Sequence, residues 1–492
     1  MSELIIVQDG RKTRVAFSGE EKLSALLQRA GMYMAHPCGG RGCCGKCAET
    51  VEGAVSAPND SERRAGARLS CQITVLGDAV VTLPDSRRDE QIETGTGVRA
   101  EALRPMPGRY GAAVDVGTTT LAVKLFDLQT GACVATSAAR NPQTAVAADV
   151  MGRIGAAMAG GLADLQAQVS AEIDRLLQAC CTQAGIAGSP ESLVVTGNTT
   201  MLYLLTGRDP TCLSHAPFQA DTLFGAQAAL LGRMAYLPPC MNAFVGADIT
   251  CAVLASGMCA RAETALLCDI GTNGEMALWK DGVLYVTSTA AGPAFEGAGI
   301  SCGCGSVRGA IDRVWLENGA LRVHTLGDGT ATGVCGSGLI DAVAAALESG
   351  RIDETGYMEE DSLPLSGGVA LLPQDIRAVQ LAKAAIAAGM EILLETAGTT
   401  WDKVRALYIA GGFGSHLNLQ SAADIGLLPP ALVNRAQSIG NAALAGAALT
   451  LLDRETHPVL ARIASSAKHV NLGGNPRFNE RYVERMLFGD EL

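Results

Sequence analysis

The stretch Gly111-Ala-Ala-Val-Asp-Val-Gly-Thr-Thr-Thr-Leu-Ala-Val-Lys124 decides how the rest of this chain is interpreted. An apolar run leads into Asp-x-Gly-Thr and an apolar alternation follows at once, which predicts two strands joined by a tight turn. Gly117 allows the backbone to come close to a ligand, and the threonines after it offer hydroxyl donors without bulk. The stretch therefore predicts a strand-turn-strand loop that can hold a polar ligand.

A second copy of this pattern occurs at Leu266-Leu-Cys-Asp-Ile-Gly-Thr-Asn-Gly-Glu275 and is again followed by apolar residues. One Asp-x-Gly-Thr could be an ordinary hairpin turn, but two copies in the same strand context are harder to explain as turns alone. From Gly111 onward, strand patterns alternate with helical ones, which is typical of α/β domains with a ligand crevice at strand ends. We expect a duplicated α/β domain, with a first lobe over 111–264 and a second lobe and C-terminal tail over 265–492.

Composition limits the classes of function that fit the chain. With 492 residues, of which 48% are hydrophobic, the chain can form about three domains with ample core. A net charge of −12 argues against nucleic acid or a membrane surface as partner. The N-terminus lacks the pattern of a signal peptide and no apolar run is long enough to span a bilayer, so we expect a cytoplasmic protein.

Cysteines are concentrated in one part of the N-terminal region. The dense stretch is His36-Pro-Cys-Gly-Gly-Arg-Gly-Cys-Cys-Gly-Lys-Cys47, and Cys71 follows at a distance. A hairpin and a helix are predicted before it, and this plan resembles plant-type and related [2Fe–2S] ferredoxins. The resemblance implies an α+β domain of the β-grasp type over 1–85. The charged, glycine- and proline-containing stretch 86–110 predicts a linker.

Spacing suggests which cysteines hold the cluster. Cys38, Cys44 and Cys47 give C-x5-C-x2-C, which keeps two residues before the last cysteine of the loop, whereas Cys43 breaks that gap. We therefore predict Cys38, Cys44, Cys47 and Cys71 as ligands and Cys43 as a spare thiol. A structural zinc site is the alternative, and the lone, distant fourth cysteine favours the iron–sulfur cluster.

The large remainder resembles the ATPase superfamily of actin, sugar kinases and the heat-shock ATPases, which has an RNase H-like duplicated α/β fold. In that superfamily two Asp-x-Gly hairpins face each other as phosphate loops, and a Gly-Gly strand end contacts adenosine. Carried over residue by residue, the resemblance assigns Asp115, Gly117, Thr118 and Thr119 to the first loop, Asp269, Gly271, Thr272, Asn273 and Gly274 to the second, and Gly411, Gly412 and Phe413 to the adenosine motif. The two aspartates would organise Mg²⁺ directly or through water.

The combination of domains is similar to a more specific family, the reductive activators of corrinoid proteins. The stretches that carry this resemblance are Asn141-Pro-Gln, Gly197-Asn-Thr-Thr-Met201, Gly292-Pro-Ala-Phe-Glu-Gly297 and Cys335-Gly-Ser-Gly-Leu-Ile-Asp341. The resemblance implies ATP-dependent, one-electron reduction of cob(II)alamin to cob(I)alamin on a corrinoid partner. It also implies an upstream low-potential electron donor and a homodimer.

Two further residues and two alternative functions belong to this interpretation. Glu275 and Glu296 are candidates to orient the attacking water, although each could instead cap a helix or pair with an arginine. The alternative functions are an electron activator of another low-potential enzyme and a redox-sensing ATP-binding regulator. Partner-stimulated ATPase activity together with cob(I)alamin formation separates the three.

Overall fold

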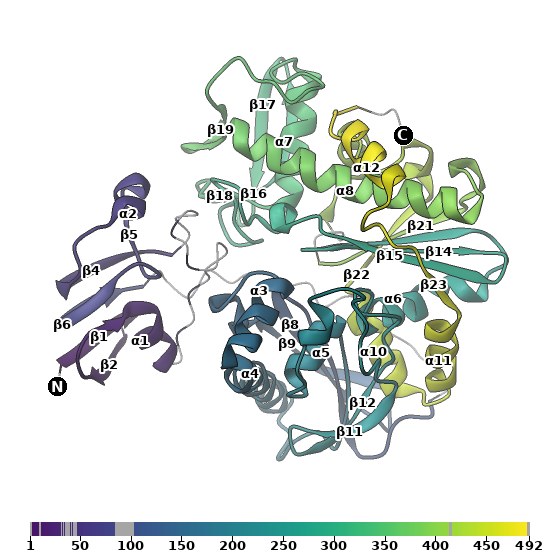
Figure 1. The fold of residues 1–492 in the computed structure, drawn as a ribbon, viewed down its shortest axis with the longest axis horizontal. Coiled ribbons are helices and arrows are strands. Elements are labelled where there is room, and N and C mark those ends of the chain that lie inside the picture. Colours follow the sequence, from purple (N-terminus) through teal and green to yellow (C-terminus); the bar gives the residue numbers. More distant parts are fainter. Residues whose placement is uncertain are drawn as a thin grey trace.

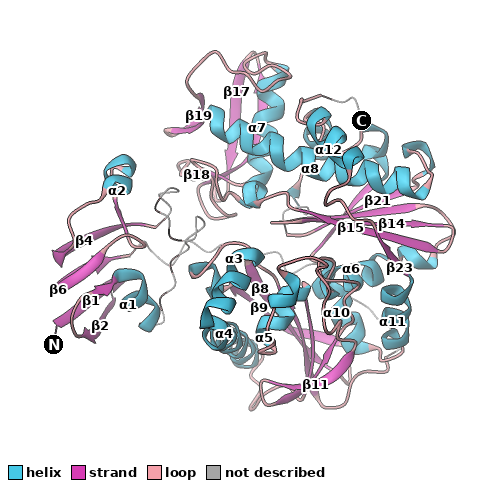
Figure 2. Ribbon diagram, in the orientation of Figure 1, coloured by secondary structure: helices cyan, strands magenta, loops and turns pink. Residues whose placement is uncertain are grey.

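The computed structural model describes residues 2–8, 11–30, 32, 34, 40, 42, 47–83, 103–412 and 416–489. Three mixed α/β units follow one another along these residues (Figures 1 and 2). No helix in this part of the chain is both long and apolar enough to cross a membrane.

The N-terminal unit is a small sheet covered by one helix (purple in Figure 1). Its strand order is β2-β1-β6-β4-β5, and β3 pairs with β6. Alternating residues of β1 and β6 bury one face of the sheet, and the leucines of α1 pack against that face. The elements are β1 (Ser2–Gln8), β2 (Arg11–Phe17), β3 (Glu21–Lys22), α1 (Leu23–Arg29), β4 (Ala48–Val55), α2 (Asp60–Ala65), β5 (Arg68–Leu69) and β6 (Thr74–Thr82).

The first lobe of the remainder contains a sheet of order β11-β12-β10-β7-β8-β9. β7, β8 and β9 are antiparallel neighbours, and β10 runs parallel to β7, so the ends of β7 and β10 meet at one edge. The elements are β7 (Tyr110–Val116), β8 (Thr120–Asp127), β9 (Ala132–Arg140), η1 (Pro142–Ala145), α3 (Val150–Ala156), η2 (Ala157–Gly161), α4 (Leu162–Gln183), β10 (Ser192–Gly197), α5 (Thr199–Leu205), η3 (Thr211–Leu213), β11 (Ala226–Leu230) and β12 (Arg233–Leu237).

The second lobe contains a sheet of order β22-β21-β13-β14-β15-β23, and β13, β14 and β15 are again antiparallel neighbours. The predicted duplication is thus present as two sheets with the same central hairpin. Before this sheet the first lobe ends with α6 (Ala247–Ser256) and η4 (Met258–Ala260). The elements of the second lobe up to α8 are β13 (Ala265–Ile270), β14 (Gly274–Lys280), β15 (Val283–Thr289), η5 (Pro293–Glu296), β16 (Ala310–Glu317), β17 (Ala320–Thr325), β18 (Gly333–Val334), α7 (Gly336–Glu348), β19 (Leu363–Ser366), β20 (Val369–Leu371) and α8 (Pro373–Ala397). The later ones are η6 (Trp401–Lys403), β21 (Ala406–Ala410), α9 (Leu419–Asp424), η8 (Pro430–Arg435), β22 (Ala436–Gly440), α10 (Ala442–Leu452), α11 (Thr456–Ser466), β23 (Ala467–His469) and α12 (Pro476–Glu484).

Helices α6 and α10 connect the two lobes. α10 packs against α6 and also against β7 and β10 of the first lobe, although it lies far along the second half of the chain (Figure 1). The contact is close, because a Cβ atom on Gly446 would lie 2.1 Å from the carbonyl oxygen of Cys251. The chain before β7 joins this contact, since Arg104 pairs with Asp453 at 2.9 Å. The two lobes therefore share a helical joint next to the cleft.

Candidate functional site

Two of the predicted cluster ligands lie within the described residues. The Sγ atoms of Cys47 and Cys71 are 3.3 Å apart and form no disulfide, which fits two thiolates that bind a common metal centre. Gln72 donates from Nε2 to the carbonyl oxygen of Gly40 at 2.6 Å and contacts the Cys71 sulfur at 3.5 Å. Cys38, Cys44 and Cys43 lie outside the described residues, so their assignment stays a prediction.

The first phosphate loop connects β7 to β8 and is held by its own backbone and by side chains of the first lobe. The Gly117 N–H donates to the Thr120 carbonyl at 2.9 Å, and a Cβ atom on Gly117 would lie 2.7 Å from that oxygen. Asn141 donates from its backbone to Thr119 O at 2.8 Å and from Nδ2 to Gly117 O at 2.9 Å. Arg153, which is fully buried, donates to Thr118 O at 2.5 Å. The loop carbonyls are thus satisfied on the lobe side, and the loop also lines the pocket.

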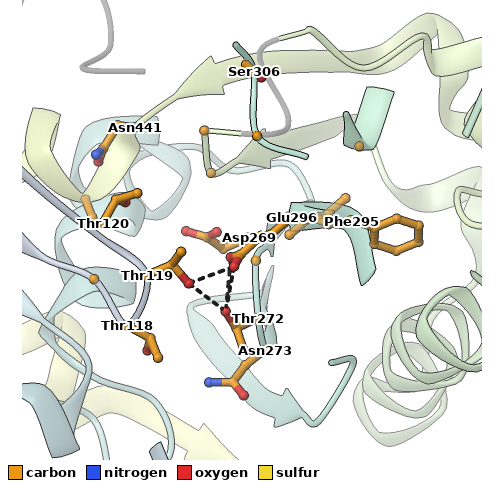
Figure 3. Close-up of a pocket in the computed structure, with 18 of the residues that line it drawn as sticks. Thr118, Thr119, Thr120, Asp269, Thr272, Asn273, Phe295, Glu296, Ser306 and Asn441 are labelled. Carbon is orange, nitrogen blue, oxygen red and sulfur yellow. Dashed lines mark hydrogen bonds between the residues drawn. The ribbon is translucent and has the colours of Figure 1, made fainter. Parts of the chain in front are cut away.

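The second phosphate loop connects β13 to β14 and faces the first across the cleft (Figure 3). The Gly271 N–H donates to the Asn273 carbonyl at 3.0 Å, and Gly274 packs so tightly that a Cβ atom would lie 2.9 Å from Ile386 Cγ1. Thr119 of the first loop and Thr272 of the second bring their hydroxyl oxygens to 3.2 Å from each other. The structure therefore brings together the two loops that the sequence separates by about 150 residues.

Glu296 at the end of η5 lies between these two hydroxyls. Thr119 Oγ1 donates to Glu296 Oε2 at 2.7 Å, and Thr272 Oγ1 lies 3.0 Å from both carboxylate oxygens. Burial raises the pKa of Glu296, and the hydrogen bonds from the two threonines oppose that rise. The predicted residue is thus in the cleft and contacts both loops.

The floor of the cleft is a cluster of buried carboxyl groups. Burial raises the pKa of Asp115 to about 6, and the Asn441 amide, which donates to Asp115 Oδ2 at 2.9 Å, opposes the rise. Burial, followed by the negative charges of Asp115 and Glu296, raises the pKa of Asp269 to about 7. Burial also raises the pKa of Glu275. Such a cluster favours a divalent cation, which would offset the repulsion between the ionised carboxylates.

A further carboxyl group of this cluster, Asp248, was not found from the sequence. It lies in the first turn of α6 and lines the same pocket, and burial followed by the charges of Asp115 and Asp269 raises its pKa. The only sequence signal was an acidic residue at a helix start, which is common. No three His, Cys, Asp or Glu side chains of the described residues converge closely enough to coordinate a metal ion by themselves.

The strand end that the resemblance assigns to adenosine also borders the pocket. Gly411 has φ +94° and follows β21, and a Cβ atom there would lie 2.8 Å from Asp269 Oδ1. Gly411 and Gly412 line the pocket, and their contact with adenosine stays a prediction; Phe413 lies outside the described residues. The stretch from Cys335 that carries the family resemblance also lines the pocket, with Cys335, Gly336 and Ser337. Other lining residues are Cys304, Gly305, Ser306 and His416.

Comparisons with known proteins agree with this architecture. Family models match the chain in three parts: a 2Fe-2S iron-sulfur cluster binding domain over 6–76, the RACo middle region over 110–261, and the C-terminal ASKHA domain of RACo over 263–491. The corrinoid activation enzyme RamQ of Eubacterium limosum is 33% identical over 423 residues, which cover 78% of this chain and 71% of that protein.

Two more proteins match over most of their length. The [Co(II) methylated amine-specific corrinoid protein] reductase of Methanosarcina barkeri is 26% identical, with 76% of each chain covered. The solved structure of a reductive activator for a corrinoid, iron-sulfur protein superposes with a TM-score of 0.74 at 27% identity, covering 99% of this chain and 98% of that one. The ferredoxin domain and the ASKHA ATPase fold predicted from the sequence are thereby confirmed.

Proposed function

The chain belongs to the family of reductive activators of corrinoid proteins, and we propose that it uses ATP to reduce cob(II)alamin to cob(I)alamin on a corrinoid protein. The observation that carries the proposal is one pocket in which two phosphate loops and a carboxyl cluster face each other, in a chain that also has a ferredoxin domain. An upstream low-potential electron donor and a homodimer are part of the proposal.

In this proposal the N-terminal domain binds the redox centre. We propose that Cys38, Cys44, Cys47 and Cys71 bind a [2Fe–2S] cluster, and the short distance between the sulfurs of Cys47 and Cys71 supports this. When bound, such a cluster supplies single electrons, at a potential of about −400 mV in plant-type ferredoxins. The Gln72 amide beside the Cys71 sulfur adds a hydrogen-bond donor, which is one of the factors that set such a potential.

In this proposal the two lobes bind and hydrolyse ATP. Backbone N–H groups and hydroxyls of the two loops would cradle the phosphates, and Asp115 and Asp269 would hold Mg²⁺ directly or through water. Phosphoryl transfer needs positioning and charge stabilisation more than covalent chemistry. Glu275 stays a candidate to orient the attacking water, and Asp248 joins it because it lies in the same buried cluster.

ATP is needed because reduction of cob(II)alamin is energetically uphill for the cluster. Each ~59 mV of uphill one-electron transfer costs about 1.4 kcal/mol, so several such steps lie within what a coupled ATP cycle can supply. Coupling requires that the ATP and ADP states of the protein differ in affinity for a partner conformation in which cobalt is easier to reduce. ATP turnover would then release the partner.

The decisive experiment is anaerobic reduction of a corrinoid protein in the cob(II) state by the full-length, cluster-loaded chain and a chemical reductant. We expect the absorbance of cob(I)alamin to appear with MgATP and to stay absent with MgADP. The corrinoid protein should also accelerate phosphate release. Equal cob(I)alamin formation with ADP or without nucleotide would refute the coupling of ATP to reduction.

A further inference from the structure

Glu296 makes contacts that the proposed hydrolysis does not explain. Its carboxylate accepts a hydrogen bond from Thr119 of the first lobe and from Thr272 of the second, at 2.7 and 3.0 Å (Figure 3). These are the hydroxyls of the two loops that face each other in the cleft, 3.2 Å apart. One carboxylate thus gathers a donor from each lobe at the point where the lobes meet.

The chemistry of these donors suits a phosphate as well as a carboxylate. Both are anions whose oxygens only accept hydrogen bonds, and donors placed for one can serve the other. A phosphoryl group and the ionised Glu296 cannot share the pair at close range, because like charges repel strongly in a buried site. Binding of a phosphoryl group at Thr119 and Thr272 therefore requires Glu296 to leave.

We propose that Glu296 holds the place of the terminal phosphate of ATP, so that ATP displaces this carboxylate and ADP leaves it bonded to both loops. The inference rests on the proposed function, because it takes ATP as the nucleotide. It makes Glu296 a specificity-determining residue that distinguishes ATP from ADP, and it gives the two nucleotide states the structural difference that coupling requires.

The backbone around Glu296 allows this displacement. Gly297, directly after Glu296, has φ +75°, a conformation that glycine adopts readily. Phe295 is buried in the second-lobe core, and the Ser301 N–H donates to Asp375 Oδ1 at 2.7 Å. The two ends of the segment are therefore fixed, and movement is confined to the residues between them.

Movement at Glu296 would pass directly to the far wall of the pocket. A Cβ atom on Gly297 would lie 2.5 Å from the Cys304 carbonyl oxygen, so these two backbones are in contact. The Cys304 N–H donates to Val334 O at 2.9 Å, and Cys335, which follows, is the N-cap of α7. Cys304 and Cys335 both line the pocket. The state of the nucleotide is thereby linked to the position of α7 through packed backbone.

The test compares nucleotide affinities of three full-length, cluster-loaded variants by calorimetry with Mg²⁺. Glu296→Gln keeps the size of the side chain and removes its charge, and Glu296→Ala removes both. Glu317→Gln is the matched control, because it removes one charge from an exposed position of β16, where Glu317 pairs with Arg322 at 3.0 Å. We expect both Glu296 variants to bind the non-hydrolysable analogue AMP-PNP about tenfold more tightly, a change of ~1.4 kcal/mol, and ADP to change less than about twofold.

The other outcomes separate the alternatives. Equal tightening for AMP-PNP and ADP, or none, would refute discrimination by Glu296. Weaker AMP-PNP binding would show that Glu296 instead holds the nucleotide or its Mg²⁺. Unchanged binding with a lower kcat would assign it to the attacking water. Failure of the unmodified protein to bind either nucleotide would refute the proposed ATPase function itself.

Discussion

The two Asp-x-Gly-Thr loops share a sequence pattern but are held in different ways. In the first loop, Asn141 and Arg153 bond three successive carbonyls, those of residues 117, 118 and 119. Within the part of the chain that the structure describes, no side chain donates to the carbonyls of Gly271–Asn273, and the bond there is internal. The second loop instead meets the first through its hydroxyl and Glu296.

This difference indicates a division of labour between the lobes. The carbonyl groups of the first loop are hydrogen-bonded to buried residues, so its remaining hydrogen-bond donors are held in one geometry. Such a loop needs little structural change when a phosphate binds. A loop held by fewer contacts can follow the nucleotide. We therefore expect the first lobe to hold a rigid phosphate-binding loop, and the loop of the second lobe, which lies beside η5, to change with the bound nucleotide.

The largest effects are expected when the aspartate that begins each loop, Asp115 or Asp269, is replaced. We expect Asp115→Asn and Asp269→Asn each to slow phosphate release by at least about a hundredfold, because each removes a carboxylate that would position Mg²⁺, the ion that stabilises charge developing on the phosphoryl group. The visible absorbance of the cluster serves as the control, since both residues lie outside the ferredoxin domain. A rate within about tenfold of normal in either variant would show that the loops do not contribute equally to the chemistry.

A second test removes a side chain that holds the backbone of the first loop and leaves the second loop unchanged. Arg153→Met leaves the Thr118 carbonyl without its donor inside the protein, and we expect a loss of about 3 kcal/mol in the free energy of unfolding and a KM for ATP about tenfold higher. Arg153→Lys keeps a donor and a charge but not the planar fork, so it should rescue part of the KM effect. If Arg153→Met lowers stability without changing KM, the arginine supports the fold and not the loop.

Local pattern made the two loops predictable, because Asp, Gly and Thr recur at the same spacing between apolar runs. The alternation of strand and helix patterns after Gly111 was predictable for the same reason: apolar residues recur at the spacing of one helix face in α4 (Leu162–Gln183). Asp248 and Arg153 were missed, since each looks in sequence like an ordinary polar residue of a helix. Their importance comes from burial beside the loops, which depends on contacts between segments far apart in the chain.

The packing of α10 on the first lobe could not be predicted either. Its sequence, Ala442–Leu452, is apolar almost all round and predicts a buried helix without naming its neighbours. Only the tertiary structure shows that this helix brings Asn441, its N-cap, to Asp115. The Asn441 amide thus contacts the first loop in the folded protein, although 326 positions separate Asn441 from Asp115 in the chain.

Substitution of Asn441 has the smallest expected effect. The Asn441 amide donates a hydrogen bond to Asp115, whereas no such hydrogen bond is among the causes that shift the pKa of Asp269. The amide lowers the pKa of Asp115, which burial raises to about 6, whereas the causes acting on Asp269, whose pKa is about 7, all raise it. Asn441→Ala should therefore raise the pKa of Asp115 toward that of Asp269. The acid limb of kcat/KM for ATP against pH, which reports groups of the free enzyme, should move to higher pH. We expect a loss of less than about threefold near neutral pH and none in alkaline solution.

The same change has a signature in stability whose sign can be worked out. A buried acid with a raised pKa keeps its proton in the folded state, so its contribution to stability is complete below the ordinary pKa of 3.8 and is lost as pH rises through about 6. Without the amide, that loss should occur at higher pH. Because Asn441 Oδ1 also caps α10 by accepting from the Leu444 N–H at 2.8 Å, Asn441→Ser is the matched control that keeps a cap acceptor without the amide. A pH profile that shifts in neither variant would mean that the Asn441 amide does not lower the pKa of Asp115. The two loops would then differ in the hydrogen bonds that hold their backbones but not in the pKa values of their aspartates.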